Sequence, residues 1–146
     1  MAYVPGITRY QKKKWMDEIS AKITAGSLKA AIYSTTTALD AATDPTTPLA
    51  YTTTGELTST GTGYAAGGYV LATPARSSTF AANAETLDFA DITTGAGTIA
   101  TGTYAMTIYD TTDSNRILAI CTVTVSVASS STAMVFSIPS DCMKIA

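Results

Sequence analysis

The clearest structural signal in the sequence is a pair of strand-like segments joined by a polar turn. In residues 98–110 (TIATGTYAMTIYD), Tyr104, Met106 and Ile108 recur at every second position, which is the period of a β-strand. The following TTDSN is a turn by composition, because Asp, Ser and Asn side chains bond to their own backbone. Residues 116–126 (RILAICTVTVS) then read as a second strand. The sequence therefore predicts a β-hairpin.

Shorter strand candidates, rich in Thr, Val, Ile and Tyr, occupy the rest of the chain from Leu28 onward. They are residues 28–34, 69–75, 78–82, 87–93, 132–138 and 142–146. The Thr/Ala/Asp/Pro-rich residues 35–62 hold at most one short strand, around LAYTT. Short strands at regular spacing predict a mainly β chain with an antiparallel β-sandwich or jelly-roll-like domain.

The first 26 residues have a different pattern. Residues 1–7 (MAYVPGI) read as an extended arm, because proline and glycine interrupt a helix there. A short helix is expected from Thr8, a plausible N-cap, to about Ala25, with Gly26 just after its end. We therefore divide the chain into residues 1–26, an arm and a basic amphipathic helix, and residues 27–146, the β-sandwich domain.

The predicted helix has an apolar stripe and a basic remainder. Trp15, Met16, Ile19 and Ile23 lie on one stripe, and Lys12 to Lys14 are expected on the other faces. Residues 1–29 carry six basic and two acidic side chains, a net charge of +4, whereas the rest carries three basic and nine acidic ones, a net charge of −6. A basic head on an acidic body predicts that the head docks on an acidic surface, more plausibly protein than nucleic acid.

The low charge content indicates a surface suited to packing. The chain of 146 residues is long enough for one core, yet charged residues make up only 14% of it. A surface of Thr, Ser, Ala and Gly is easily desolvated, which favours contact with copies or partners. An ordinary secreted, Thr-rich β domain is the alternative.

Cysteine use and the N-terminus bear on the cellular compartment. Cys121 and Cys142 lie in apolar strand-like contexts, and we interpret them as buried thiols rather than a disulfide, because nothing else indicates a secreted chain. The N-terminus lacks the apolar core of a signal peptide, and no stretch is long enough to span a membrane. These features predict folding in a cytoplasm.

The sequence offers little for catalysis. It has no histidine, which removes the usual general base and the commonest metal ligand. Asp88 and Asp91 are more plausibly solvated strand ends than a catalytic pair, and residues 110–115 (DTTDSN) are a turn rather than a calcium loop, because the glycine and distant glutamate are missing. We expect no enzyme activity, no cofactor, no metal and no small-molecule substrate.

The glycine-rich segment TGTGYAAGGYVL (60–71) also lacks phosphate-binding context. Tyr69 follows Gly68, where a P-loop has lysine, and a β-like segment follows where a dinucleotide site needs a helix. We expect these glycines to supply positive φ angles and close backbone approach at the entrance to a strand.

The order of these segments resembles a family of small virion structural proteins of tailed bacteriophages. The resemblance rests on LKAAIYSTTTALD, AYTTTGEL joined to GTGYAAGGYVL, LDFADIT and YAMTIYDTTDSNRILAI, and it covers most of the chain from Leu28. Thr93 and Thr94 stand where that family often has tryptophan, and the basic helix is not part of its pattern. The resemblance implies a β-sandwich component assembled in many copies on a virion, with no catalytic residues.

Within that class, a capsid decoration or cement protein that bridges capsomers is the first expectation. Its partners would be the major capsid protein and copies of itself, with no nucleic acid and no membrane. The residues expected to dock are Tyr3, Val4, Ile7, Arg9, Tyr10, Lys12, Lys13, Lys14 and Trp15. The alternatives are a tail, collar or fibre-base protein and a carbohydrate- or host-surface-binding module. The last would use Tyr64, Tyr69, Tyr104 and Tyr109 as a stacking face.

Overall fold

The structure, a computed structural model, is mainly β with one N-terminal helix, which confirms the predicted class. It describes residues 7–33, 49–57, 63–72, 75–79, 84–97, 99, 102–125, 129–140 and 142–145. The elements are α1 (Arg9–Thr24), β1 (Leu28–Tyr33), β2 (Tyr69–Val70), β3 (Ala75–Thr79), β4 (Ala84–Asp88), β5 (Ile92–Gly97), β6 (Gly102–Asp110), β7 (Arg116–Val125), β8 (Ser129–Ser137) and β9 (Met143–Ile145). The arm proposed for residues 1–7 falls outside the described part, apart from Ile7.

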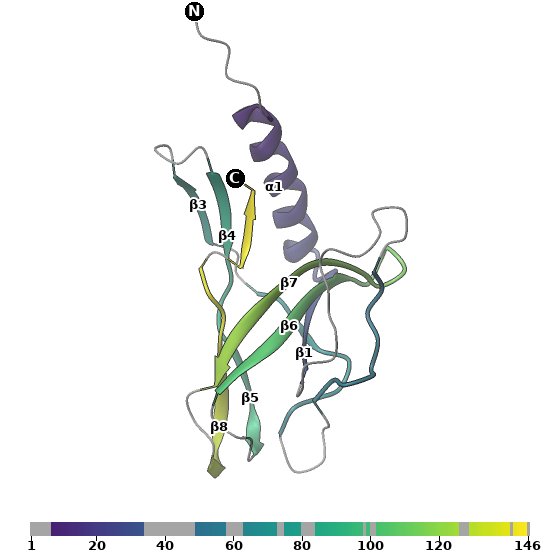
Figure 1. Ribbon diagram of the computed structural model, residues 1–146, viewed down its shortest axis with the longest axis vertical. Coiled ribbons are helices and arrows are strands. Elements are labelled where there is room, and N and C mark those ends of the chain that lie inside the picture. Colours follow the sequence, from purple (N-terminus) through teal and green to yellow (C-terminus); the bar gives the residue numbers. More distant parts are fainter. Residues whose placement is uncertain are drawn as a thin grey trace, which may run out of the picture.

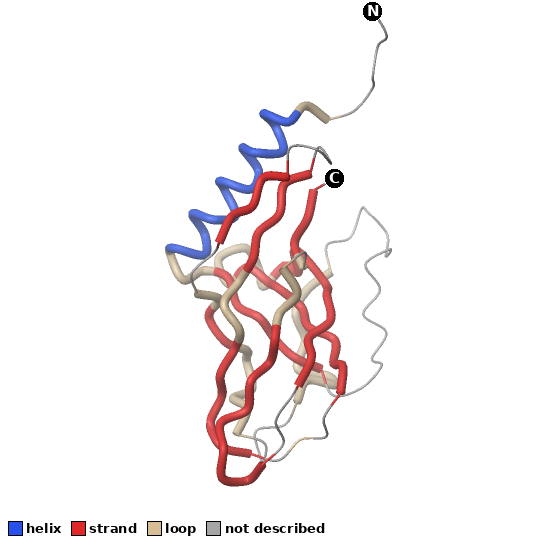
Figure 2. Tube along the Cα trace, turned by 90° about the vertical axis from the view of Figure 1, so that its left-hand side faces the viewer, coloured by secondary structure: helices blue, strands red, loops and turns tan. Residues whose placement is uncertain are grey.

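The strands form two antiparallel sheets. The larger has the order β2-β1-β6-β7-β8-β5, and the smaller has the order β3-β4-β9. The larger sheet curves until it is nearly closed into a barrel-like shape. The smaller sheet and α1 extend together from one end of it, with the helix running alongside the strands (Figures 1 and 2).

The expected hairpin is present as β6 and β7, which pair from Gly102–Val125 to Asp110–Arg116. Its turn has positive φ angles at Ser114 (51°) and Asn115 (56°), and the Arg116 N–H donates to the Asp113 carbonyl at 2.9 Å. Positive φ at both central residues is the pattern of a type I′ turn, whose twist suits a hairpin. The turn prediction for this segment is confirmed.

The last five residues of β6 are all buried, on both faces of the sheet. Met106 and Ile108 belong to the main core, inside the curve of the larger sheet. Tyr109 points the other way into a second, smaller cluster with Ala31 and Tyr33, against which Tyr51 packs. The second face is buried because residues 49–57 cross over it, and this explains why apolar side chains occupy both registers of the strand.

The helix begins and ends where its caps predict. The Thr8 side chain accepts from the Gln11 N–H at 3.3 Å. At the other end Gly26 has a φ of 70°, and its N–H donates to the carbonyl of Ile23. The Ser27 N–H donates to the carbonyl of Lys22 at 3.0 Å, which completes a Schellman motif.

The buried face of α1 differs from the predicted stripe. Met16 and Ile23 are buried and Ile19 is half-buried, but Trp15 remains 38% exposed. Lys12, expected on an outer face, is only 3% exposed, so that prediction is wrong. Lys12 lies one turn before Met16 on the same face, and a lysine stem can pack against apolar surface at such a position.

Two strand boundaries also differ from the sequence expectation. The predicted strand 69–75 is represented by Tyr69 and Val70 in β2 and by Ala75 at the start of β3, with residues 73–74 outside the described part. Residues 87–93 are divided between β4 and β5 rather than forming one strand. The chain turns a corner between them, where Asp91 accepts a hydrogen bond from the Ile138 N–H at 2.9 Å. This contact with a segment far along the chain has no local sequence signal.

Cys121 in β7 and Cys142 just before β9 form a disulfide. The interpretation of these residues as buried thiols is therefore wrong. The two Cα atoms lie 5.5 Å apart, a normal separation for a bridged pair. The fold brings them together because the chain returns past β7 on its way from β8 to the smaller sheet.

Candidate functional site

The glycine-rich segment packs directly against backbone. Gly63, Gly67 and Gly68 have φ angles of 67°, 91° and 69°. A Cβ atom on Gly63 would lie 2.4 Å from the Gly95 carbonyl oxygen, and one on Gly68 would lie 2.4 Å from the Ala30 carbonyl oxygen. At Gly63 and Gly68 the backbone of the sheet fills the space beside the glycine, so no room remains there for a phosphate. The interpretation of these glycines as structural is confirmed.

A buried carboxylate lies beside this loop. Glu56 is 6% exposed. Its Oε1 accepts from the Tyr64 hydroxyl at 2.7 Å and from the Gly67 N–H at 3.0 Å, and its Oε2 accepts from the Tyr51 hydroxyl at 2.5 Å. We call Glu56, Tyr51, Tyr64 and Gly67 the Glu56 cluster.

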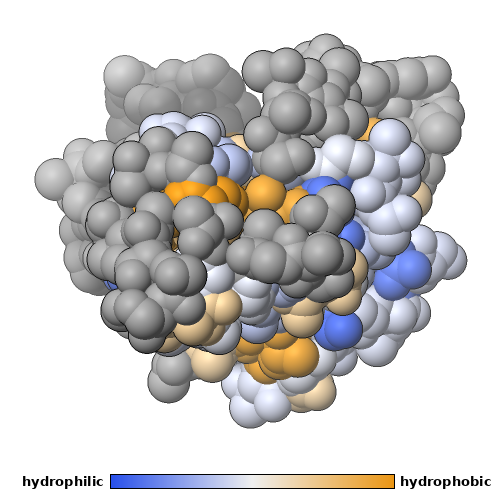
Figure 3. Space-filling model, turned by 90° about the horizontal axis from the view of Figure 1, so that it is seen from below, coloured by the Kyte–Doolittle hydropathy of each residue, from blue (hydrophilic) through white to orange (hydrophobic). Residues whose placement is uncertain are grey.

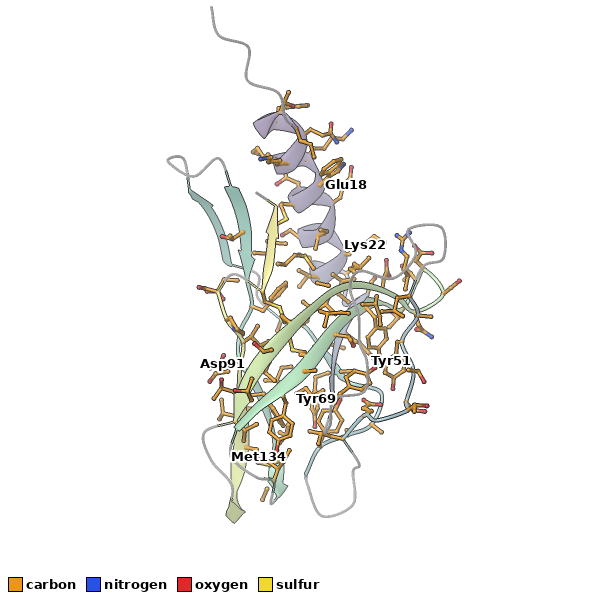
Figure 4. The ribbon with its side chains drawn as sticks, viewed as in Figure 1. Glu18, Lys22, Tyr51, Tyr69, Asp91 and Met134 are labelled. Carbon is orange, nitrogen blue, oxygen red and sulfur yellow. A yellow bond between two sulfur atoms is a disulfide. The ribbon has the colours of Figure 1, made fainter. Side chains whose placement is uncertain are left out.

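Two further tyrosines, Tyr109 and Tyr33, lie beside the Glu56 cluster. The Tyr109 hydroxyl donates to the Gly67 carbonyl at 2.6 Å, and the Tyr33 hydroxyl donates to the Thr52 carbonyl at 2.9 Å. The rings of Tyr51 and Tyr109 stack with centroids 4.3 Å apart. These contacts fasten residues 49–57 and the glycine turn to β1 and β6; Figure 4 shows Tyr51 and Tyr69 in this region.

The environment keeps these phenols protonated. Burial, followed by the hydrogen bond with Glu56 and its charge, raises the pKa of Tyr51 well above its usual value. The pKa of Tyr64 is likewise raised, mainly by burial. Burial and the charge of Glu56 raise the pKa of Tyr109 to about 12. These groups therefore act as hydrogen-bond donors near neutral pH and not as bases.

The Glu56 cluster has a structural role. Both carboxylate oxygens of Glu56 already accept hydrogen bonds, so ligating a cation or removing a proton from a substrate would break existing contacts. Sequence reasoning missed this role, although Tyr51, Glu56, Tyr64 and Gly67 all lie in the segments that carry the resemblance. The pairing of AYTTTGEL with GTGYAAGG was the available signal.

A second buried carboxylate connects the helix to the hairpin. Asp110 is 0% exposed, pairs with Lys22, and accepts from the N–H and hydroxyl of Thr112. Burial opposes ionisation, but the hydrogen bond from Lys22 and those from Thr112 outweigh it and lower the pKa of Asp110 to about 2. Lys22 lies in the part of α1 nearest the larger sheet (Figure 4).

Of the two carboxylates singled out in the sequence, Asp88 ends β4 and Asp91 lies just before β5. Asp91 is committed to the backbone of Ile138 and also accepts from the Ser137 hydroxyl at 3.2 Å. A hollow of about 140 Å³ lies beside Asp91, lined by residues 69–72 and 90–93. Among the described residues, no group of three His, Cys, Asp or Glu side chains is placed to hold a metal ion.

The residues expected to dock on a partner are only partly brought together. Ile7, Tyr10 and Trp15 are 47%, 77% and 38% exposed on the N-terminal half of α1 or just before it. Lys14 is exposed and Lys13 pairs with Asp17 at 2.9 Å, whereas Lys12 is buried. Arg9 is the first residue of α1, and Tyr3 and Val4 lie outside the described residues.

The proposed tyrosine stacking face does not exist as four exposed rings. Tyr64 and Tyr109 are 1% and 3% exposed. Tyr69 and Tyr104 are half-buried, packed against the main core. Two of the four rings are therefore closed to a sugar, because they face inward into hydrogen-bonded and apolar surroundings.

No family model, curated protein or solved structure matches this chain. The part of the chain that the structure describes has no helix long and apolar enough to cross a membrane. The fold defines the protein as a mainly β chain with an antiparallel, nearly closed sheet and an N-terminal helix.

Proposed function

We propose that this chain is a structural component of a tailed-phage virion, and specifically a capsid decoration protein that docks through α1. The observation that carries the proposal is the exposure of Tyr10, with Ile7 and Trp15, on a helix that extends away from the larger sheet (Figure 1). Exposed aromatic side chains are frequent anchors of protein interfaces, because they bury large areas at little entropic cost.

The composition of the described surface supports an assembled state. On the end opposite α1, the described residues that can be seen are mostly of intermediate hydropathy, with small apolar patches and a few strongly hydrophilic residues (Figure 3). Removing such a surface from water requires little desolvation of charge. A protein that binds the assembled shell stabilises that shell by mass action.

The burial of Lys12 changes the expected basis of docking. One of the three consecutive lysines is inside, and Lys13 is engaged with Asp17. Charge therefore contributes less to docking than the sequence indicated, and the aromatic residues contribute more. Substituting all three lysines would disturb the packing around buried Lys12 as well as remove charge. Such a variant would therefore not isolate the contribution of charge to docking.

The test is binding of the full chain to empty phage shells that lack it. Tyr10→Ser with Trp15→Ser should weaken binding at least about tenfold, because buried aromatic anchors dominate interface energies. Ala21→Ser, at an exposed position on the same helix, is the matched control. Unchanged binding by the double variant would contradict the proposal, and association with tails instead of shells would favour a tail or collar protein.

A further inference from the structure

The Cys121–Cys142 disulfide lies where the C-terminal part of the chain separates from the larger sheet. Among the described residues, backbone pairing of β7 with β8 is limited to Thr124–Ser137 and Val125–Phe136. Beyond β8 the chain turns away and enters β9, which pairs with β4 in the smaller sheet. The disulfide therefore joins β7 to the segment that runs from β8 to β9.

Among the described residues, the segment after β8 is held by the pairing of one short strand and by the buried side chains of Ile138 and Met143. β9 has three residues, which pair with Glu85 to Leu87 of β4. Asp91 holds the start of this segment by accepting hydrogen bonds from the Ser137 hydroxyl and the Ile138 N–H. A strand this short is weakly held by pairing alone, so a covalent link at the residue just before it strongly affects how often it leaves the sheet.

The disulfide joins two half-buried cysteines that pack against the main core. We propose that it is a redox-controlled latch, which holds β9 against β4 when closed and releases it when reduced. This inference concerns the fold and does not depend on the proposed role in a virion.

The chemistry of the latch is thiol–disulfide exchange. On opening, a thiolate attacks one sulfur of the bridge and forms a mixed disulfide, and the other cysteine leaves as a thiolate that takes up a proton. A second thiolate then resolves the mixed disulfide, so two external thiols become one external disulfide. Closing reverses these steps and uses a low-molecular-weight disulfide as the oxidant.

Release of β9 would change more than the C-terminus. β4 is the central strand of the smaller sheet, and α1 packs against it. Without β9, one edge of β4 loses its partner, and a two-stranded sheet is marginal. The latch would thereby control the rigidity of the support under α1.

The test compares oxidised full chain with the same protein treated with dithiothreitol, without denaturant. Trypsin cleavage after Lys144, in β9, removes Ile145 and Ala146 and is read by mass. Reduction should speed this cleavage at least about tenfold and raise hydrogen exchange in residues 142–145. Residues of the β6–β7 hairpin should keep their protection.

The double variant Cys121→Ala/Cys142→Ala is the control. It should behave like reduced wild type and be insensitive to dithiothreitol; if it does not fold, the wild-type comparison still decides. Equal protection of residues 142–145 in both redox states would overturn the proposal. Resistance of the bridge to native reduction, or an even loss of protection throughout the chain, would overturn it as well.

Discussion

Lys22, in the last turn of α1, forms an ion pair with Asp110 at the end of β6, 88 residues later in the chain. Asp110 is fully buried, whereas the Lys22 side chain is 41% exposed. The Thr111 N–H also donates to the Ser27 carbonyl at 2.9 Å, so the end of the helix and the hairpin turn are joined by backbone as well. The helix is thereby fixed to the larger sheet at its C-terminal end, while Tyr10 and Trp15 in its N-terminal half remain exposed.

Replacing Lys22 by Met should lower the free energy of unfolding by about 1–3 kcal/mol, because Asp110 would remain buried with only the Thr112 donors. Urea denaturation measures the change. Lys13→Met, which breaks the exposed ion pair with Asp17, is the matched control and should cost no more than about 0.5 kcal/mol. Equal effects of the two variants would show that Asp110 does not depend on Lys22.

The same pair predicts sensitivity to acid. The pKa of Asp110 is about 2 in the folded protein and 3.8 in the reference state. A lowered folded pKa stabilises the protein above the unfolded value, so this contribution is present above about pH 4 and is lost as the pH falls towards 2. Stability curves of wild type and Asp110→Asn should converge over this range. A constant difference between them would contradict the assignment.

Glu56→Gln should destabilise the fold by about 1–3 kcal/mol, because an amide offers one acceptor where three donors converge. It should also lower the pKa values of Tyr51 and Tyr64, since it removes the charge that helps raise them. Ultraviolet titration of tyrosinate measures this effect. Thr54→Ser, at an exposed position in the same loop, should change neither quantity.

Alkaline pH should destabilise the protein through the buried phenols. The pKa of Tyr109 rises from 10.0 to about 12 on folding, so its contribution is complete below pH 10 and is lost as the pH rises towards 12. Tyr109→Phe should reduce this loss, although it also removes the hydrogen bond to Gly67. Identical alkaline transitions in wild type and variant would show that this group is not responsible.

Gly68→Ala should destabilise the protein more than Gly67→Ala does. Both glycines have positive φ angles, so alanine at either costs about 1 kcal/mol. A methyl group on Gly68 would also overlap the Ala30 carbonyl, whereas one on Gly67 meets nothing within 4 Å. The added overlap should cost roughly 1–3 kcal/mol more by thermal or urea unfolding. Equal losses would contradict the close approach of this turn to β1.

Several elements follow from neighbouring residues alone. The β6–β7 hairpin is encoded by a period of two around a polar turn, and α1 is encoded by Thr8, Gly26 and its apolar spacing. The positive φ angles of Gly63, Gly67 and Gly68 follow from the clustering of glycines before a strand. These features are local, because backbone preference and side-chain period are properties of consecutive residues.

Only the tertiary structure decided the rest. The disulfide between Cys121 and Cys142 and the burial of Lys12 depend on the packing of separate elements against one another. The three hydrogen bonds to Glu56 come from residues 5, 8 and 11 positions along the chain, but they form only where residues 49–57 and the glycine turn lie side by side against β1 and β6. Sequence spacing shows which residues share a face, but not what covers that face. In this chain the crossing of residues 49–57 over β6 and the return of the chain past β7 determine which polar groups are buried and which partners they meet.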